Sequence, residues 1–482
     1  MKRARAVALS LLFVASGAWA DELTESQSAR SNGVSNPLPS GGEVPPQPPR
    51  AASLPWPEDP AGPPPDETLP RVNRWNYLAR IDAMPLALLP RRGVGEREGF
   101  VQVEPTLVVD GGAEFGLNLG APVRLRLGGG DARGGWVRKE DWDTLSDWGQ
   151  WVRALKLGSD AAPMGVWLGA LESYSLLSGH LVQRYSNRGN PNYHPAGGFL
   201  TGALAPFYVE AFASDVLGAR LIGAEVELDV QHVLFGRPSQ AGRFTLALSA
   251  VHDWGRAGGD SPELTLAHLD GTAVVVVHPD YEMHLLAGYG GRPGRGGAWG
   301  AVAGVGMDVE TLSLNARLRL ELRRQHGGFR QGTFGPDYEL ARFRVAGVTA
   351  GGGPAAEAPF PDGYSVYAEA NVGWDRVRLG GLLQRHLDGS LAVEAFSWGR
   401  VDMDGRVAVQ LFTRSLELAL SGRVVGANVT GTRSLVSAEM RWRFAGKLYA
   451  LARGGTLLFP SPGWELRPGS FVSMGLGVDN AR

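Results

Sequence analysis

The sequence contains no cysteine, so it has no disulfide, no thiolate metal site and no cysteine for lipid attachment. Long apolar runs are also missing. Beyond the first 20 residues the longest purely aliphatic run is residues 273–277, whereas a membrane-spanning helix needs about 20 consecutive apolar residues. These absences exclude a helical membrane protein.

Neither sign of charge dominates the chain. The formal net charge is −2 and no long block of one sign occurs, whereas nucleic-acid-binding proteins carry a clustered basic footprint. Nucleic acid is therefore not expected as a partner.

Motifs of catalysis are missing too: there is no HExxH helix, nucleophile elbow, phosphate-binding loop or cysteine–histidine pair. Five histidines are scattered near the ends of expected strands without ligand spacing: His252, His278, His284, His326 and His386. We predict no catalytic residue, no metal and no cofactor.

The N-terminal region resembles a targeting segment followed by a spacer. Lys2, Arg3 and Arg5 precede a short apolar stretch that ends in Ala18-Trp19-Ala20, which is typical of a secretory signal peptide over residues 1–20; an uncleaved anchor is the alternative. Residues 21–71 are crowded with proline, and such a segment buries too little surface to fold. We predict a disordered, extended periplasmic arm, either a passive linker or a docking segment. Residues 72–99 suggest a short helix or plug-like segment.

Alternation of apolar and polar residues is the main signal in the rest of the chain. In residues 311–324 the even positions are almost all leucine, while the odd positions include Arg317, Arg319, Glu321 and Arg323. A period of two indicates a strand, because successive side chains of a strand point to opposite faces. The run is about 12 residues long, enough to cross a bilayer as a tilted strand.

The same pattern recurs in residues 123–127, 225–231, 364–375 and 435–444. Turn signals separate the runs: Asp110-Gly111-Gly112, Asp270-Gly271, Asp388-Gly389, Asp404-Gly405 and Ala445-Gly446. Between residues 100 and 479 we count about 16 to 20 runs and expect roughly 16–18 strands.

Signal segment, alternation, hairpin spacing and aromatic strand ends together resemble the Gram-negative outer-membrane β-barrels, as a class. The resemblance implies an all-β fold, a transmembrane antiparallel barrel over residues 100–482, apolar side chains facing lipid and polar ones facing a lumen. It also implies localisation in the outer membrane.

Twelve charged residues are lumen-lining candidates by their phase in these strands. They are Arg124, Arg126, Glu225, Glu227, Asp229, Arg317, Arg319, Glu321, Arg323, Glu369, Arg441 and Arg443. Arginine rings in a pore favour anions, but acids recur beside the bases, so ion pairs that brace the wall are the alternative.

A short amphipathic helix is expected at residues 144–156, where Thr144 can cap a helix with Asp147 at its third position. Trp142, Asp143, Trp148 and Trp151 would mark either a helix that constricts the lumen or a surface helix that binds a partner. A helix packed passively on the rim is equally compatible with the pattern.

Residues 173–198 combine tyrosine, histidine, asparagine and arginine, including Tyr174, His180, Arg184, Tyr185 and Asn187. Aromatic rings beside amides suit sugar rings. A polar loop rich in asparagine and glycine is the commoner explanation.

Barrels of this size act as porins, channels or membrane parts of envelope machines. The proline-rich arm and the helix favour a non-catalytic component or channel of a surface polysaccharide export or motility machine. The alternatives are a general or anion-favouring porin for small solutes and a barrel enzyme that acts on outer-membrane lipid. Expected partners are outer-membrane lipid, periplasmic proteins or lipoproteins bound through the arm, and a polysaccharide or small solute.

Overall fold

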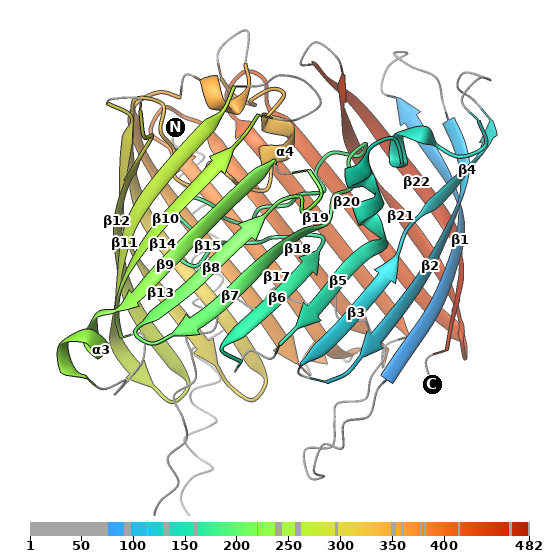
Figure 1. Ribbon diagram of the computed structural model, residues 1–482. Coiled ribbons are helices and arrows are strands. Elements are labelled where there is room, and N and C mark those ends of the chain that lie inside the picture. The colour runs from blue at the N-terminus through green and yellow to red at the C-terminus, as the bar shows by residue number, and fades with distance from the viewer. Residues whose placement is uncertain are drawn as a thin grey trace, which may run out of the picture. The chain divides into compact units, whose positions relative to one another are not determined.

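The computed structural model describes residues 76–90, 98–112, 114–128, 135–158, 162–218, 220–236, 243–255, 262–294, 297–348, 353–358, 360–375, 378–379, 382–412, 415–461 and 465–480. In these residues the chain forms one antiparallel sheet that closes into a barrel (Figure 1). Closure is direct, because β22 (Glu465–Asp479) pairs with β1 (Asn76–Pro90) as well as with β21 (Leu448–Ser461). The expected signal peptide and proline-rich arm lie outside the described residues.

The wall is built from consecutive neighbours in the chain. The other strands are β2 (Glu98–Asp110), β3 (Phe115–Gly120), β4 (Val123–Gly128), β5 (Val152–Leu157), β6 (Met164–Gly169), β7 (Gly197–Leu204), β8 (Phe207–Ala213), β9 (Leu221–Asp229), β10 (Phe244–Asp253), β11 (Leu264–His278), β12 (Tyr281–Gly291), β13 (Trp299–Glu310), β14 (Leu314–His326), β15 (Gly363–Asp375), β16 (Arg378–Leu379), β17 (Leu382–Phe396), β18 (Val401–Leu411), β19 (Leu416–Ala427) and β20 (Arg433–Ala445). β3 and β4 follow each other along β2, and β15 and β16 follow each other along β17. The 22 strand segments therefore occupy 20 positions in the wall.

Among the described residues the helices are few and short. They are η2 (Lys139–Asp141), η3 (Leu145–Trp151), α3 (Val230–Phe235), α4 (Tyr338–Ala341) and η4 (Ala355–Glu357). In the described part of the chain, no helix is long and apolar enough to cross a membrane.

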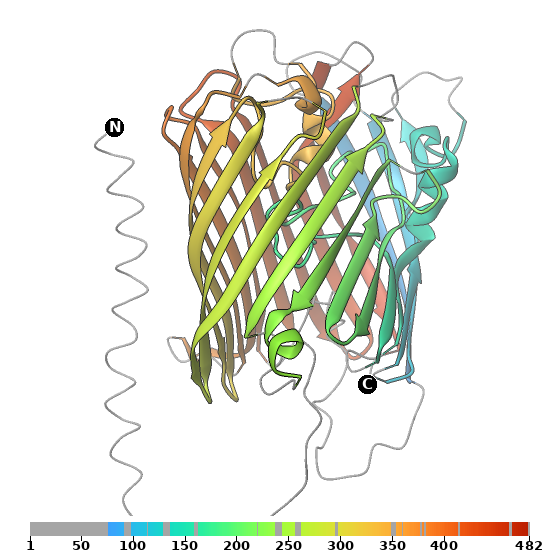
Figure 2. The ribbon, with the colours of Figure 1, turned by 60° about the vertical axis from the view of Figure 1, so that its left-hand side comes forward.

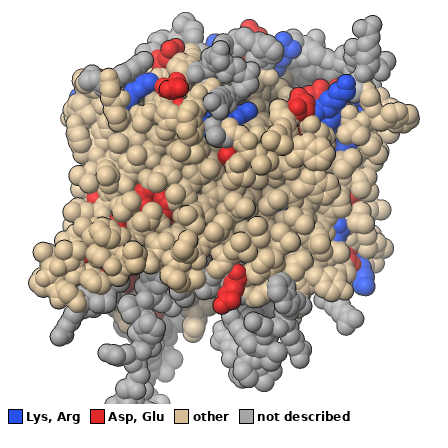
Figure 3. All heavy atoms as spheres, viewed as in Figure 1, with Lys and Arg blue, Asp and Glu red and all other residues tan. Residues whose placement is uncertain are grey.

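The outer face is apolar, as the alternation predicts. On β14, Leu320 and Leu322 are exposed, whereas Glu321 between them and Arg323 after them are buried on the inner side. On the face shown in Figure 3, a broad band of the wall carries few charged side chains. Such a band suits the hydrocarbon layer of a bilayer, and a closed sheet leaves no backbone edge unpaired in it.

Connections differ in length between the two ends of the barrel. At the end where β1 begins and β22 ends, most connections are short, such as residues 205–206, 279–280 and 446–447, and a longer one contains α3. The opposite end carries the long connections, including residues 170–196 and 327–362. In bacterial barrels the short turns face the periplasm and the long loops face outward.

Residues 72–99 are not a helix or plug: the described part of them lies in the wall, as β1 and the start of β2. The prediction failed because Pro85 breaks the strand signal. Proline has no N–H to donate to the ladder, and the pairing of β1 with β22 is interrupted between Ala83 and Leu86. The 20 wall positions exceed the expected 16–18 partly for this reason.

Three of the five expected hairpin turns are wrong. Asp270, Asp388 and Asp404 lie inside β11, β17 and β18, each paired on both sides. Asp270 and Asp404 have partners across the lumen instead, as described below. The turns at Asp110-Gly111-Gly112 and Ala445-Gly446 are confirmed.

Candidate functional site: a loop across the lumen

Residues 170–196, between β6 and β7, fold into the barrel rather than away from it (Figures 1 and 2). We call this segment the crossing loop. It leaves the wall between positions five and six, and its Arg184 contacts β15, β17 and β18, which are positions 14 to 16 of the 20. Strands about ten positions apart face each other, so the crossing loop spans the diameter of the lumen.

Arg184 fastens the loop to the far wall. Its Nε and Nη2 donate to Oδ2 of Asp404 at 2.9 and 2.7 Å. Nη1 lies 3.2 Å from Oδ1 of Asn371 and 3.4 Å from Oε1 of Glu369, and Nη2 lies 3.1 Å from Oγ of Ser390. Burial opposes the charge, but the carboxylate of Asp404 outweighs it and holds the pKa of Arg184 above its ordinary value.

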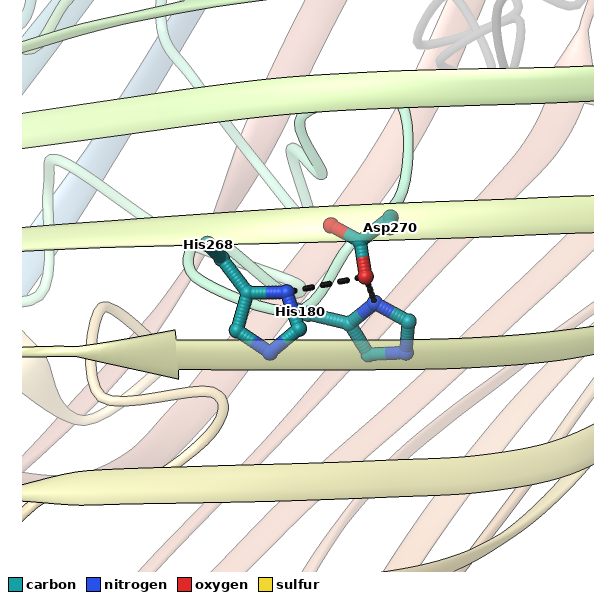
Figure 4. Close-up of side chains that lie close together, drawn as sticks. All are labelled: His180, His268 and Asp270. Carbon is teal, nitrogen blue, oxygen red and sulfur yellow. Dashed lines mark hydrogen bonds and ion pairs between the residues drawn. The ribbon is translucent and has the colours of Figure 1, made fainter.

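His180 anchors the loop to a different part of the wall. Its Nδ1 lies 2.6 Å from Oδ1 of Asp270 on β11, and its Nε2 lies 2.6 Å from Nη2 of Arg319 on β14. His268, two residues before Asp270, approaches the same carboxylate oxygen at 2.8 Å (Figure 4). The loop is thus held to both β11–β14 and β15–β18.

A hydrophobic core lies between the crossing loop and the wall at β8–β11. Its buried members from the loop include Leu171, Tyr174, Leu176, Leu181, Val182 and Tyr185, and those from the wall include Phe212, Leu221, Val251, Leu264 and Leu266. The tyrosine hydroxyls find acidic partners: Tyr174 donates to Glu210 at 2.5 Å, and Tyr185 donates to Glu339. Burial, together with these carboxylates, raises the pKa of both phenols well above the ordinary value. This side of the lumen is filled at the height of the loop.

Residues 327–362, between β14 and β15, reinforce this packing from above; we call them the rim loop. Arg330 donates to Oε2 of Glu394 at 3.1 Å and to Oδ2 of Asp402 at 2.7 Å. Burial opposes the charge of Arg330, but Asp402 and Glu394 raise its pKa overall. The two loops also pair directly, because the backbone of Gln183 donates to the carbonyl of Phe334.

A small polar cavity of about 100 Å³ remains between the two loops and the wall. Arg184, Arg330, Arg400 and Arg423 line it together with Glu394, Asp402, Asp404 and Asp337. Its bases and acids are equal in number, and most are paired with each other.

On the inner face of β1 and β2, Asp82 and Glu104 are buried. Charged side chains on the inner face of β20 and β21 are more accessible, and we call this part of the wall the open side. The side chains of Glu439, Arg453 and Arg443 keep 41%, 22% and 27% of their exposure there, whereas those of Glu321 and Arg323 under the crossing loop keep 0%. Ion pairs run along this face as well: Arg453 lies between Glu104 and Glu439. A water-filled path beside the loop would run along the open side.

All twelve lumen-lining candidates lie on the inner face, since their neighbours in each strand form the exposed apolar exterior. They are not equivalent. Glu225, Glu321 and Arg323 are buried under the crossing loop, where Glu225 accepts from the backbone of Ser178 and Arg323 donates to Gln183. Arg441 and Arg443 lie on the open side and pair with Glu417 and Asp479.

The expected helix is shorter and faces outward. Thr144 and Asp147 form the predicted capping box, but η3 ends at Trp151, and residues 152–157 are strand β5. Trp148 and Trp151 are exposed and Trp142 packs against both, while Asp143 is exposed. Constriction of the lumen by this helix is therefore ruled out, because its inward groups are Ser146, Asp147 and Gln150. Binding of a partner stays a prediction.

Sequence reasoning missed the residues that hold the loop in place. Tyr174, His180, Arg184 and Tyr185 stood out as a polar, aromatic segment, but they are buried in contacts with the wall and do not form an open sugar-binding face. Asp270 and Asp404 were interpreted as turn residues, and their partners His180 and Arg184 lie 90 and 220 residues away in the chain. His268, which approaches Asp270, gave no signal of its own. The sequence signal that could have identified these wall residues was a single acidic residue on the inward-facing phase of a strand.

No family model matches the sequence, and no curated protein matches it. The chain is similar to several solved structures: OccK8 (OprE) from Pseudomonas aeruginosa is 9% identical with a TM-score of 0.35, over 85% of this chain and 98% of that chain. A porin is 9% identical with a TM-score of 0.30, over 84% and 100%. CdiB from Acinetobacter baumannii is 6% identical with a TM-score of 0.27, over 84% of this chain and 60% of CdiB.

The closed wall, with exposed apolar side chains along its outer face, decides the class. The chain is an outer-membrane β-barrel protein. At such identities and TM-scores the likeness concerns the fold and carries nothing about substrate or partner. This chain also spans less than two thirds of the length of CdiB. The function of the outer-membrane barrel has to come from its own lumen.

Proposed function

We propose that this outer-membrane β-barrel is a porin-type channel for small polar solutes. The observation that carries the proposal is the crossing loop, which is fastened at Arg184 and His180 and leaves the open side lined by partly exposed charged side chains. A loop that is fixed inside a barrel narrows the lumen and leaves part of its cross-section open. The width of a 20-stranded wall supports an aqueous lumen beside the loop.

The charge pattern favours weak discrimination between anions and cations. Arg441 and Arg453 are each paired with an acid on the adjacent strand, and Arg443 is paired with Asp479, two strands away. The electric fields of paired charges largely cancel. The open side therefore favours a general pore over an anion-selective one.

Planar bilayers test the proposal. The purified protein should insert with discrete conductance steps, and a salt gradient should give a reversal potential close to zero. Liposome swelling with sugars and amino acids of increasing size would then give the size limit. A preparation that is folded but never conducts, both as wild type and as Arg184→Ala, would exclude the channel.

The envelope-machine prediction depends mainly on the arm at residues 21–71, which lies outside the described residues. Its test is different: a barrel without the arm should lose periplasmic or lipoprotein partners in a pull-down but still conduct.

The lipid-enzyme alternative needs a hydroxyl, an imidazole and a carboxylate in one hydrogen-bonded chain. His252 accepts or donates at 2.8 Å to Thr265, and its other contact is an edge-on packing with Trp254. Among the described residues no carboxylate lies within ion-pair distance of His252, so this pair does not favour the enzyme.

A further inference from the structure

Three polar side chains meet in the buried contact between the crossing loop and the wall. Nδ1 of His180 and Nδ1 of His268 lie 2.6 and 2.8 Å from the same Oδ1 of Asp270 (Figure 4). The three residues are only 2%, 1% and 3% exposed, and one ligand atom from each lies within 4.8 Å of the others. Two imidazoles and one carboxylate are a ligand set that proteins use for zinc and related ions.

The cluster makes fewer hydrogen bonds than buried polar groups usually make. Neither Nδ1 nor Nε2 of His268 has a hydrogen bond of good geometry within the described structure, and Oδ2 of Asp270 has none either. Buried polar groups ordinarily have a partner, and a group without one indicates an unseen ion or water. A cation among His180, His268 and Asp270 would satisfy one nitrogen of His268 and the carboxylate at once.

The neighbouring strand makes room for the cluster. Gly290 on β12 pairs with His268, and Gly288 pairs with Asp270. A Cβ at Gly290 would lie 2.2 Å from Cδ2 of His268, and a Cβ at Gly288 would lie 2.2 Å from Oδ1 of Asp270. Both glycines are thus required for these two side chains to lean over β12 toward His180.

Residues around the cluster suit a metal-bound histidine. A histidine that binds a metal through one nitrogen usually donates the other N–H to a carboxylate, which orients the ring. Oε1 of Glu321 lies 3.3 Å from Nε2 of His180. Without a metal, that nitrogen accepts from Arg319. With Nδ1 bound to a metal, Nε2 carries the proton, so the guanidinium of Arg319, which can only donate, has to move away from Nε2, and Glu321 becomes the acceptor for Nε2.

We propose that His180, His268 and Asp270 bind one divalent transition-metal ion of the zinc type, through Nδ1, Nδ1 and a carboxylate oxygen. The ion joins the crossing loop to β11 and stiffens the constriction from the side opposite Arg184. This site is independent of what passes through the lumen, so its failure would leave the channel proposal standing.

The test uses the full-length protein purified in detergent with an affinity tag that contains no histidine. After treatment with a chelator and dialysis, zinc is added and bound metal is measured by elemental analysis and by competition with a chromophoric chelator. We expect one zinc per chain and a higher unfolding temperature in its presence. His180→Asn and His268→Asn should each reduce bound zinc to background, and Glu321→Gln should weaken binding by roughly 10- to 100-fold.

His278→Asn is the matched control, because His278 also lies near an aspartate, at 3.9 Å from Asp280, but is exposed at a turn; it should bind zinc like the wild type. Cobalt(II) absorption of the wild-type protein gives a second readout that needs no variant: bands typical of nitrogen and oxygen ligands are expected. Absence of zinc and cobalt binding in the folded wild type would overturn the proposal. So would unchanged binding in both folded histidine variants, which would mean that the three residues form a metal-free hydrogen-bonded contact.

Discussion

Nη2 of Arg184 lies 2.7 Å from Oδ2 of Asp404, although 220 residues separate the two along the chain. The pair joins a loop that leaves one side of the barrel to a strand on the other side. Arg184 has a positive φ of 52°, a conformation that L-residues other than glycine seldom adopt. This backbone conformation costs free energy, and the five polar contacts of the Arg184 side chain with the far wall offset that cost.

Replacement Arg184→Ala should release the middle of the crossing loop. Removing one partner of a buried ion pair costs about 3–5 kcal/mol because the other charge stays buried, here at Asp404. We expect larger and noisier conductance steps with an intact barrel. Val407→Ala, on the exposed outer face of the same strand, is the control and should conduct like the wild type. Identical conductance in Arg184→Ala and wild type would show that the loop does not set the pore size.

Leu320→Arg should destabilise the barrel in lipid. Leu320 is exposed at the middle of β14, and an arginine at the bilayer midplane costs about 2–4 kcal/mol. Reversible urea unfolding in lipid vesicles measures the change. Ser437→Arg is the control, since Ser437 faces the lumen and loses one hydrogen bond to Ser421, worth about 1 kcal/mol. An equal loss in both variants would contradict a lipid-facing exterior.

Gly475→Ala should impair closure of the barrel. A Cβ at this position would lie 2.3 Å from the carbonyl oxygen of Ala83, in the seam between β1 and β22. Backbone cannot yield as a flexible side chain does, so we expect a loss of about 1–3 kcal/mol, typical of overpacking. Gly422→Ala meets open space and should be nearly neutral. The folded fractions of the two variants after refolding provide the comparison.

Acidification should loosen the segment around η2. Burial favours the neutral form of Asp141, but the imidazole of His194 at 3.8 Å and the charges of Arg124 and Arg138 outweigh it and lower its pKa below the ordinary 3.8. A lowered folded-state pKa means that the stabilisation is complete above about pH 3.8 and is lost as the pH falls through the lower folded value. The fluorescence of Trp142 between pH 2 and 5 should report this change. Asp141→Asn should remove the acid-dependent step; its persistence would place the titration elsewhere.

Much of the wall could be predicted from local pattern. In β14 and β20 apolar and charged side chains alternate along much of the strand, and the structure places the two kinds on opposite faces as expected. The capping box at Thr144 was also predictable, because cap and partner lie three residues apart. The prediction failed at Pro85, because a proline within a strand hid β1, and at Asp404, because an Asp-Gly pair on the inward-facing side of β18 was interpreted as a turn.

Alternation alone thus determined that this protein is a lipid-facing barrel, because the period of two in a strand is a property of neighbouring residues. What fills the barrel was decided by tertiary structure alone. The contacts of Arg184 with Asp404 and of His180 with Asp270 bridge 220 and 90 residues, and no local period carries information over such separations. They exist because closure of the sheet brings opposite walls within reach of one loop.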